Sequence, residues 1–207
     1  METIILDHPL IKHKMVKLRD KSTGTKEFRE SVNEIAGLMS YEATKDLALK
    51  PVEVETPLQR TMGEALEKSV VIIPVMRAGL GMVDMIQNLI PTAKVGHIGL
   101  FRDEETFIPQ EYYTKLPADL GHATILLLDP MLATGGTVKV SYDILKRHGA
   151  KDIRYLGIVG VQEGLDHLEK HCPDMKVYLA AKDEKLNEDK YIVPGLGDAG
   201  DRLFGTK

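Results

Sequence analysis

Apolar residues recur at every third or fourth position in a stretch that begins at Phe28. The stretch contains Phe28, Val32, Ile35 and Met39 at this spacing, and serine and threonine residues stand just before it. This period places the apolar residues on one face of a helix, and the hydroxyl residues are typical N-caps. The pattern therefore predicts an amphipathic helix over about residues 25–47, with its apolar face in the core.

A second pattern, strict alternation, covers the residues between Pro51 and Pro57. Valine and glutamate alternate there. A period of two predicts a short strand with one wet face, and the flanking prolines favour a position near a sheet edge.

From Val70 onward the apolar residues come in short blocks. The blocks cover residues 70–75, 125–128, 153–161 and 177–181, and helical patterns over residues 81–89, 136–148 and 164–171 lie between most of them. Apolar strands that alternate with helices are typical of a parallel sheet covered on both faces. We therefore expect an α/β fold with an open, doubly wound, mainly parallel sheet.

Two stretches depart from this alternation. Residues 101–117 are polar, carry Tyr112 and Tyr113, and are expected to form either a flap or an ordinary exposed hairpin. Residues 183–207 contain Pro194 and several glycines, which predicts no regular element there. Because the sequence contains no repeat or linker, residues 1–207 are expected to form a single domain. Three acidic residues near the start of the last stretch are interpreted as a solvated turn: Asp183, Glu184 and Glu188.

The charge balance argues against some classes of partner. The chain has 27 lysine and arginine residues against 31 aspartate and glutamate residues, a net charge of −4, so neither nucleic acid nor a membrane is expected as a partner. The first residues lack the basic start and apolar stretch of a signal peptide, and no apolar run approaches the ~20 residues that span a bilayer. The one cysteine, Cys172, cannot form an internal disulfide, so a cytoplasmic location is expected.

The most informative motif comes directly after the apolar block at residues 125–128. It combines an acid at the end of a buried strand with a hydroxyl- and glycine-rich loop that leads into a helix. Glycines let the backbone approach an anion, successive N–H groups point inward, and the helix N-terminus adds positive charge. This predicts a phosphate cradle, with a simple tight turn as the alternative. The motif consists of Asp129, Pro130, Met131, Leu132, Ala133, Thr134, Gly135, Gly136 and Thr137.

Within this motif, Asp129 and Gly136 have the most definite expected roles. Asp129 stands at the carboxyl end of a strand, where open α/β sheets place ligand contacts, and is expected to accept hydrogen bonds from sugar hydroxyls. Gly136 is expected to allow close approach to the phosphate and to require a positive φ. The spacing excludes a Walker loop, and Gly79 and Gly81 lack the third glycine of a dinucleotide fingerprint.

Two histidines, His167 and His171, stand four residues apart beside Cys172. Leu168 follows His167, so the pattern of a zinc protease is broken. A surface helix is the preferred interpretation, and no metal ligands are predicted in the chain.

Beyond the cradle, four longer stretches resemble the uracil phosphoribosyltransferases, and the resemblance runs from His8 to the end of the chain. The stretches read PVMRAGLGMVD at residues 74–84, VGHIGLFRD at 95–103, EYYTKLP at 111–117 and YIVPGLGDAGDR at 191–202. Pro130 stands where the wider superfamily has a second acid, which leaves Asp129 alone at the ribose.

The resemblance implies transfer of the phosphoribosyl group of 5-phosphoribosyl 1-pyrophosphate (PRPP) to N1 of uracil, giving UMP and pyrophosphate. It implies catalytic roles for Arg77, Arg102 and Asp198, which also bind PRPP together with the nine residues of the cradle. From the residues alone, both arginines could instead be surface residues paired with acids, because each merely follows an apolar run. Uracil is expected to contact the glycine-rich ending, which could otherwise only pack on the sheet. The uracil-binding residues implied are Tyr191, Ile192, Gly197, Asp198 and Ala199.

The resemblance also implies Mg²⁺ bound mainly through the pyrophosphate and ribose of PRPP, and a homo-oligomer, at least a dimer. Regulation by GTP stays open, as does contact of Tyr112, Tyr113 and Lys115 with substrate. Two rival functions are a phosphoribosyltransferase for another base and a non-catalytic sensor of PRPP.

Overall fold

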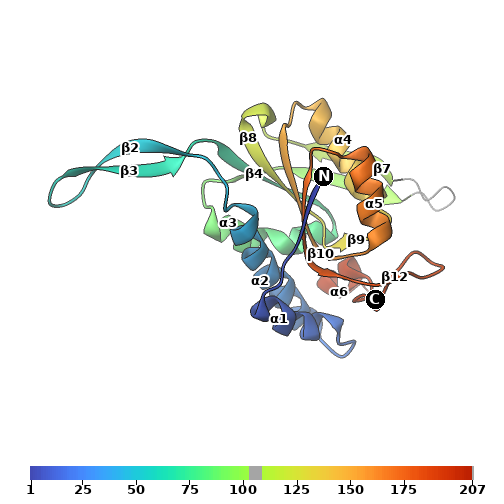
Figure 1. The fold of residues 1–207 in the computed structure, drawn as a ribbon. Helices are drawn as coiled ribbons and strands as arrows, with labels where there is room; N and C mark the ends of the chain where they lie inside the picture. The colour runs from blue at the N-terminus through green and yellow to red at the C-terminus, as the bar shows by residue number, and fades with distance from the viewer. Residues whose placement is uncertain (103–108, 207) are drawn as a thin grey trace.

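The computed structural model describes residues 1–102 and 109–206, with the side chain of Arg102 left out. Its centre is a sheet (Figure 1). The main strands of this sheet follow the order β1-β11-β10-β8-β4-β6-β7. All neighbouring pairs along this path are parallel except β6 with β7. The strands of this path are β1 Glu2–Ile5, β4 Ser69–Met76, β6 His97–Arg102, β7 Pro109–Lys115, β8 Ala123–Leu128, β10 Asp152–Gly160 and β11 Lys176–Lys182. The short strands β5 Lys94–Val95 and β9 Met131–Leu132 pair with β4 and β10.

Helices cover both faces of this sheet, which confirms the doubly wound α/β fold. On β4, Val70 and Ile72 belong to one apolar cluster, while Val71 and Ile73 belong to another on the opposite face. The first cluster includes side chains from α1 Pro9–Arg19, α2 Thr25–Ala43, the 3₁₀ helix η1 Ala78–Met82 and α3 Val83–Leu89. The second includes side chains from the 3₁₀ helix η2 Leu120–His122, α4 Gly136–Arg147 and α5 Gln162–His171. The continuous apolar runs of the sequence therefore reflect burial on both faces.

The amphipathic helix predicted from Phe28 is α2, and its apolar stripe is buried as expected. Phe28 and Ile35 are 0% exposed. The helix ends at Ala43 and not near residue 47, and its N-cap is Gly24, without a side-chain cap hydrogen bond. The apolar period thus predicted the buried face of the helix correctly, but it placed the C-terminal end of the helix too late.

A two-stranded hairpin projects from the body of the molecule, as Figure 1 shows. It consists of β2 Leu49–Glu55 and β3 Arg60–Leu66, which pair only with each other. The expectation of a strand with one wet face near a sheet edge is therefore wrong, because every residue of β2 is exposed. Alternation predicted the strand itself correctly, but both of its faces are open to solvent.

The C-terminal stretch contains regular structure, contrary to the expectation of none. It forms a small hairpin, β12 Lys185–Leu186 with β13 Ile192–Val193, and a helix, α6 Ala199–Phe204. Asp198 caps α6 by accepting from the Asp201 N–H, and Gly205 ends it at φ 66°. The proline and two of the four glycines lie between β13 and α6, so they interrupt the segment without preventing the helix.

No helix among residues 1–102 and 109–206 is long and apolar enough to cross a membrane.

Candidate active site

Two predicted site residues, Arg77 and Asp129, come directly after adjacent parallel strands. Arg77 follows β4 and Asp129 follows β8, with Pro74 paired to Leu128 at the ends of these strands. The chain leaves β4 through α3 on one face and β8 through α4 on the other, so the connections diverge here. Open α/β sheets bind ligands at such a switch point, outside the carboxyl ends of the strands. The backbone of Arg102 ends β6, the neighbour of β4 on the other side.

Gly79 allows the loop that carries Arg77 to lie against the end of β8. A Cβ atom at this position would come within 2.3 Å of the Leu128 carbonyl oxygen. That distance is far below van der Waals contact, so any side chain would push the two loops apart. Gly79 thus has a packing role between strands, although the lack of a third glycine excluded a dinucleotide fingerprint here.

The predicted phosphate cradle runs from the end of β8 through β9 to the start of α4, but the glycine that needs a special backbone is Gly135. Gly135 has φ 81°, and a Cβ atom there would lie 3.1 Å from the Gly164 carbonyl oxygen and from Cδ2 of His167. Gly136 begins α4, and a Cβ atom there would meet nothing closer than 3.6 Å. The expectation of a positive φ at Gly136 is therefore wrong, because the preceding residue, Gly135, has it. The loop lies back against α5, which fixes its shape.

Replacing Gly135 by alanine is expected to weaken PRPP binding by about tenfold or more, since a left-handed backbone costs a residue with a Cβ about 1–3 kcal/mol. Isothermal titration calorimetry with PRPP measures this. Gly149→Ala is the matched control, because Gly149 has φ 86° but its Cβ atom would meet nothing within 4 Å. Wild-type affinity in Gly135→Ala would contradict the assignment of this loop.

Asp129 is held in place through its main chain and its carboxylate. Its Oδ1 accepts from the Met131 N–H at 3.3 Å, and its carbonyl oxygen accepts from the Tyr155 hydroxyl at 2.7 Å. Tyr155 is fully buried, and burial together with the Asp129 charge raises its pKa well above the usual value, so it stays a neutral donor. No sequence signal indicated this role, because Tyr155 lies inside an apolar strand.

The C-terminal segment meets the loop after β4 at Arg77. Arg77 Nη2 lies 3.3 Å from Asp201 Oδ1, and the guanidinium lies 5.9 Å from the centre of the Phe204 ring. A Cβ atom on Gly200 would be 3.3 Å from Asp198 Oδ1 and 3.7 Å from Arg77 Nη2. The structure therefore brings Arg77 and Asp198 together, although they are far apart in the sequence.

The residues expected to bind uracil surround two left-handed glycines in the turn between β13 and α6. Gly195 has φ 63° and Gly197 has φ 78°. The side chains of Ile192 and Ala199 are buried in the core, at 6% and 3% exposure, while Tyr191 is 48% exposed. Ile192 and Ala199 can therefore reach a ligand at the surface of this turn only through main-chain groups.

The predicted flap at residues 101–117 corresponds in part to the antiparallel pair β6 and β7, and residues 103–108 of it lie outside the described residues. Tyr112 and Tyr113 are 55% and 46% exposed. Tyr112 lies over Gly99, since a Cβ atom there would come within 2.6 Å of Cζ. Contact of Tyr112, Tyr113 and Lys115 with a ligand stays open, and the role of the Arg102 side chain stays a prediction.

The two histidines of α5 pack on each other, with ring centroids 4.6 Å apart. Cys172 is buried, which raises the pKa of its thiol to about 12. Among residues 1–102 and 109–206, no group of three or more His, Cys, Asp or Glu side chains is placed to hold a metal ion. His167 instead contacts the cradle at Gly135, which its place in the sequence did not indicate.

The interpretation of Asp183 as part of a solvated turn is wrong. Its side chain is 4% exposed and forms an ion pair with Arg19 of α1. A carboxylate is buried in this way only when it is paired and hydrogen-bonded. No sequence signal could join these two residues, because they lie 164 positions apart.

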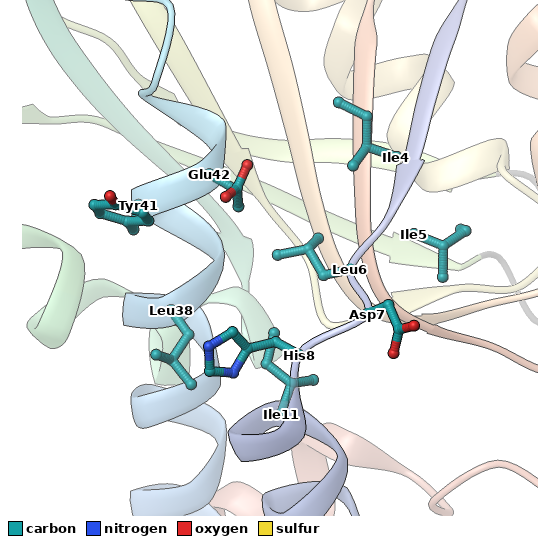
Figure 2. A pocket seen from close by; sticks show the side chains of 9 residues that line it. All are labelled: Ile4, Ile5, Leu6, Asp7, His8, Ile11, Leu38, Tyr41 and Glu42. Carbon is teal, nitrogen blue, oxygen red and sulfur yellow. The ribbon is translucent and has the colours of Figure 1, made fainter.

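A separate pocket of about 270 Å³ lies between β1, the start of α1 and α2 (Figure 2). Apolar side chains such as Ile11 and Leu38 line it, together with Asp7, His8 and Glu42. It contains none of the predicted site residues.

Sequence relatives share nearly the full length of the chain. The model of the uracil phosphoribosyltransferase family matches residues 5–206. A uracil phosphoribosyltransferase of Acholeplasma laidlawii is 56% identical over 204 residues, which cover 99% of this chain and 98% of the relative. One from Symbiobacterium thermophilum is 57% identical over 205 residues, with 99% and 98% covered.

Solved structures share the fold of this chain. A protein of Aquifex aeolicus has a TM-score of 0.95 at 36% identity, with 99% of both chains covered. A purine phosphoribosyltransferase of Pyrococcus horikoshii has a TM-score of 0.50 at 16% identity, with 91% of this chain and 95% of that chain covered, which indicates a shared fold. With the family match over almost every residue and relatives above 50% identity, the chain belongs to the uracil phosphoribosyltransferase family.

Proposed function

We propose that this chain transfers the phosphoribosyl group of PRPP to N1 of uracil, giving UMP and pyrophosphate in pyrimidine salvage. The observation that carries the proposal is the meeting of Arg77 and Asp198 next to the loop that begins at Asp129. The edge of the sheet would thus offer a cation for the leaving group, an acid and a phosphate cradle. Family membership supports the choice of uracil as the acceptor.

The donor would occupy the carboxyl edge of β4 and β8. The 5′-phosphate would bind at the N–H groups and hydroxyls of residues 133–137, where the α4 N-terminus adds favourable charge. Asp129 would accept from the ribose hydroxyls, with Tyr155 keeping its main chain in place. Arg77 and Arg102 would bind the pyrophosphate through guanidinium forks, which match phosphate oxygens.

No enzymic nucleophile is needed, because N1 of uracil attacks the sugar C1 directly. The C1–O bond to pyrophosphate breaks, the C1–N1 bond forms and the N1–H proton is released to water, so negative charge grows on the leaving group. Donors fixed at that position stabilise the charge more than water does. Asp198, held by the Asp201 N–H at 2.9 Å, would orient the donor beside Arg77. The strands β6 and β7 would carry a flap that excludes water.

Mg²⁺ would reach this site on the donor. The described acids at the sheet edge do not form a cluster of three, which suits an ion that keeps most of its ligands on substrate phosphates and water. Such an ion would neutralise charge on the pyrophosphate. Asp129 and Asp198 are the carboxylates that would hold it together with the donor.

We also propose that residues 1–207 act as one domain, with a flap at about 101–117 and a base-binding segment at about 183–207. A homo-oligomer in the cytoplasm is proposed as well. The projecting hairpin supports the oligomer, because Val54 and Met62 are 44% and 65% exposed on strands that pair only with each other. The single cysteine supports a reducing compartment.

The direct test is product formation by the purified protein. It is incubated with PRPP, Mg²⁺ and one base at a time, either uracil, cytosine, hypoxanthine or guanine. We expect UMP from uracil, loss of activity when EDTA removes Mg²⁺, and negligible nucleotide from the other bases. A purine nucleotide as the main product would favour a transferase for another base. Binding of PRPP without any product would favour a sensor.

A further inference from the structure

We propose that Arg19 and Asp183 are positioning residues that set base selectivity by holding the uracil-reading turn in one conformation. This inference rests on the proposed function, since it assigns these residues to the base site. Neither residue belongs to the cradle or to the set expected to contact uracil.

Asp183 and Arg19 hold Gly195 from both sides of its peptide backbone. The Gly195 N–H donates to Asp183 Oδ2 at 2.8 Å, and the Gly195 carbonyl oxygen accepts from Arg19 Nη1 at 2.9 Å. The two side chains also pair with each other, Nη1 to Oδ2 at 2.8 Å and Nη2 to Oδ1 at 2.5 Å. Gly195 is therefore fixed by a bidentate ion pair and not by a regular element.

The turn at Gly195 needs such support. Gly195 and Gly197 both have left-handed backbones, and glycine makes a backbone flexible. A site that reads hydrogen bonds must hold its groups within about 0.5 Å, and residues behind the contacts provide this rigidity. Gly197 and Asp198, expected to contact uracil and its donor, lie two and three positions after Gly195.

A second arginine extends the same support. Arg202 of α6 donates to the Leu196 carbonyl oxygen at 2.8 Å and to the Asp20 carbonyl oxygen at 2.7 Å. Its guanidinium lies 4.2 Å from the centre of the Phe28 ring of α2. Arg202 thus links the end of α1, where Arg19 lies, to Leu196, the residue after Gly195.

The burial of this ion pair indicates that it fixes the geometry of the turn more than it stabilises the fold. The Asp183 side chain is 4% exposed and the Arg19 side chain is 30% exposed. A buried ion pair adds little net stability, because desolvation offsets its attraction, but it specifies one arrangement of its partners. Asparagine at position 183 has almost the same shape but only one acceptor oxygen, so it cannot accept from both Arg19 nitrogens and the Gly195 N–H together.

The test compares Asp183→Asn and Arg19→Lys with wild type in steady-state kinetics. Glu184→Gln and Lys17→Met are matched controls, because both side chains are exposed neighbours on the same segments. We expect both test variants to raise KM for uracil by about ten- to a hundredfold, as for one or two lost buried hydrogen bonds, with KM for PRPP nearly unchanged. The ratio of kcat/KM for uracil to that for cytosine should fall about tenfold or more.

Hydrogen exchange gives a readout without activity. Amide exchange measured by mass spectrometry should speed up over residues 192–198 in Asp183→Asn and stay unchanged over β10. If wild type makes no UMP, the proposed function fails, while exchange still tests the support of the turn.

Three results would overturn the inference. The first is an unchanged KM for uracil with only a lower melting temperature, which is the mark of a purely structural pair. The second is an equal rise in KM for both substrates, and the third is wild-type exchange over residues 192–198. If Asp183→Asn does not fold, Arg19→Lys, which keeps the charge, decides by the same criteria.

Discussion

Replacing Arg77 by alanine is expected to lower kcat by about 10²–10³-fold, the usual effect of removing one fixed donor from a developing negative charge. Because charge grows on the departing pyrophosphate, the lost contact matters more in the transition state than in the bound donor. The effect should therefore fall mainly on kcat, with a smaller rise in KM for PRPP. Initial rates of UMP formation with both substrates varied measure the two effects separately.

If Arg77 had only a structural role, its removal would have a small effect. Its contact with Asp201 is a 3.3 Å ion pair in which the arginine is 54% exposed, and exposed pairs of this kind contribute little stability. Arg147→Ala is the control, since Arg147 is also mostly exposed, at 67%, and forms a 3.4 Å pair with Glu111. Arg77→Lys should restore part of the rate, because an ammonium group cannot form the bidentate fork. If Arg77→Ala lost no more activity than Arg147→Ala, the arginine would not act on the leaving group.

The sequence predicted the sheet edge well because its signals are local. The apolar runs of β4 and β8 are buried on both faces, and the residues directly after each run stand at the carboxyl end of a strand. Parallel strands then bring Arg77 and Asp129 to one edge without further information. The same reasoning covers the backbone of Arg102 at the end of β6.

The features that sequence reasoning missed depend on contacts between distant segments. Asp183 looks like part of a polar turn until Arg19 is seen beside it. The residue types in the loop did not indicate whether Gly135 or Gly136 has the positive φ, because that conformation depends on how the loop packs on α5. The glycines before α6 concealed a short helix whose cap, Asp198, is also an expected site residue. Local pattern thus predicted which residues lie at the sheet edge, and tertiary packing determined how they are held there.

Selectivity for uracil over cytosine is expected to reach about four to five orders of magnitude in kcat/KM, as in other sites that read hydrogen bonds. Uracil presents an acceptor, a donor and an acceptor along O2, N3–H and O4. Cytosine has an acceptor at N3 and an amine in place of O4, so two groups of a fixed turn would lose their partners. Each buried polar group left unpaired costs about 1–3 kcal/mol. Substituents at the 5 position of uracil lie off this edge, so 5-fluorouracil should remain a substrate.

The structure makes a sharper form of this prediction possible at Ile192. Its side chain is 6% exposed and belongs to the core cluster, so only its main chain can face a base. Ile192→Val, which removes one buried methylene, should therefore lower stability by about 0.5–1.5 kcal/mol and leave the ratio of uracil to cytosine unchanged. Thermal unfolding and steady-state kinetics with each base at saturating PRPP measure the two effects. Cytosine turnover within tenfold of uracil in the wild-type protein would refute the pocket, whereas a changed ratio in Ile192→Val alone would mean that the side chain itself reads the base.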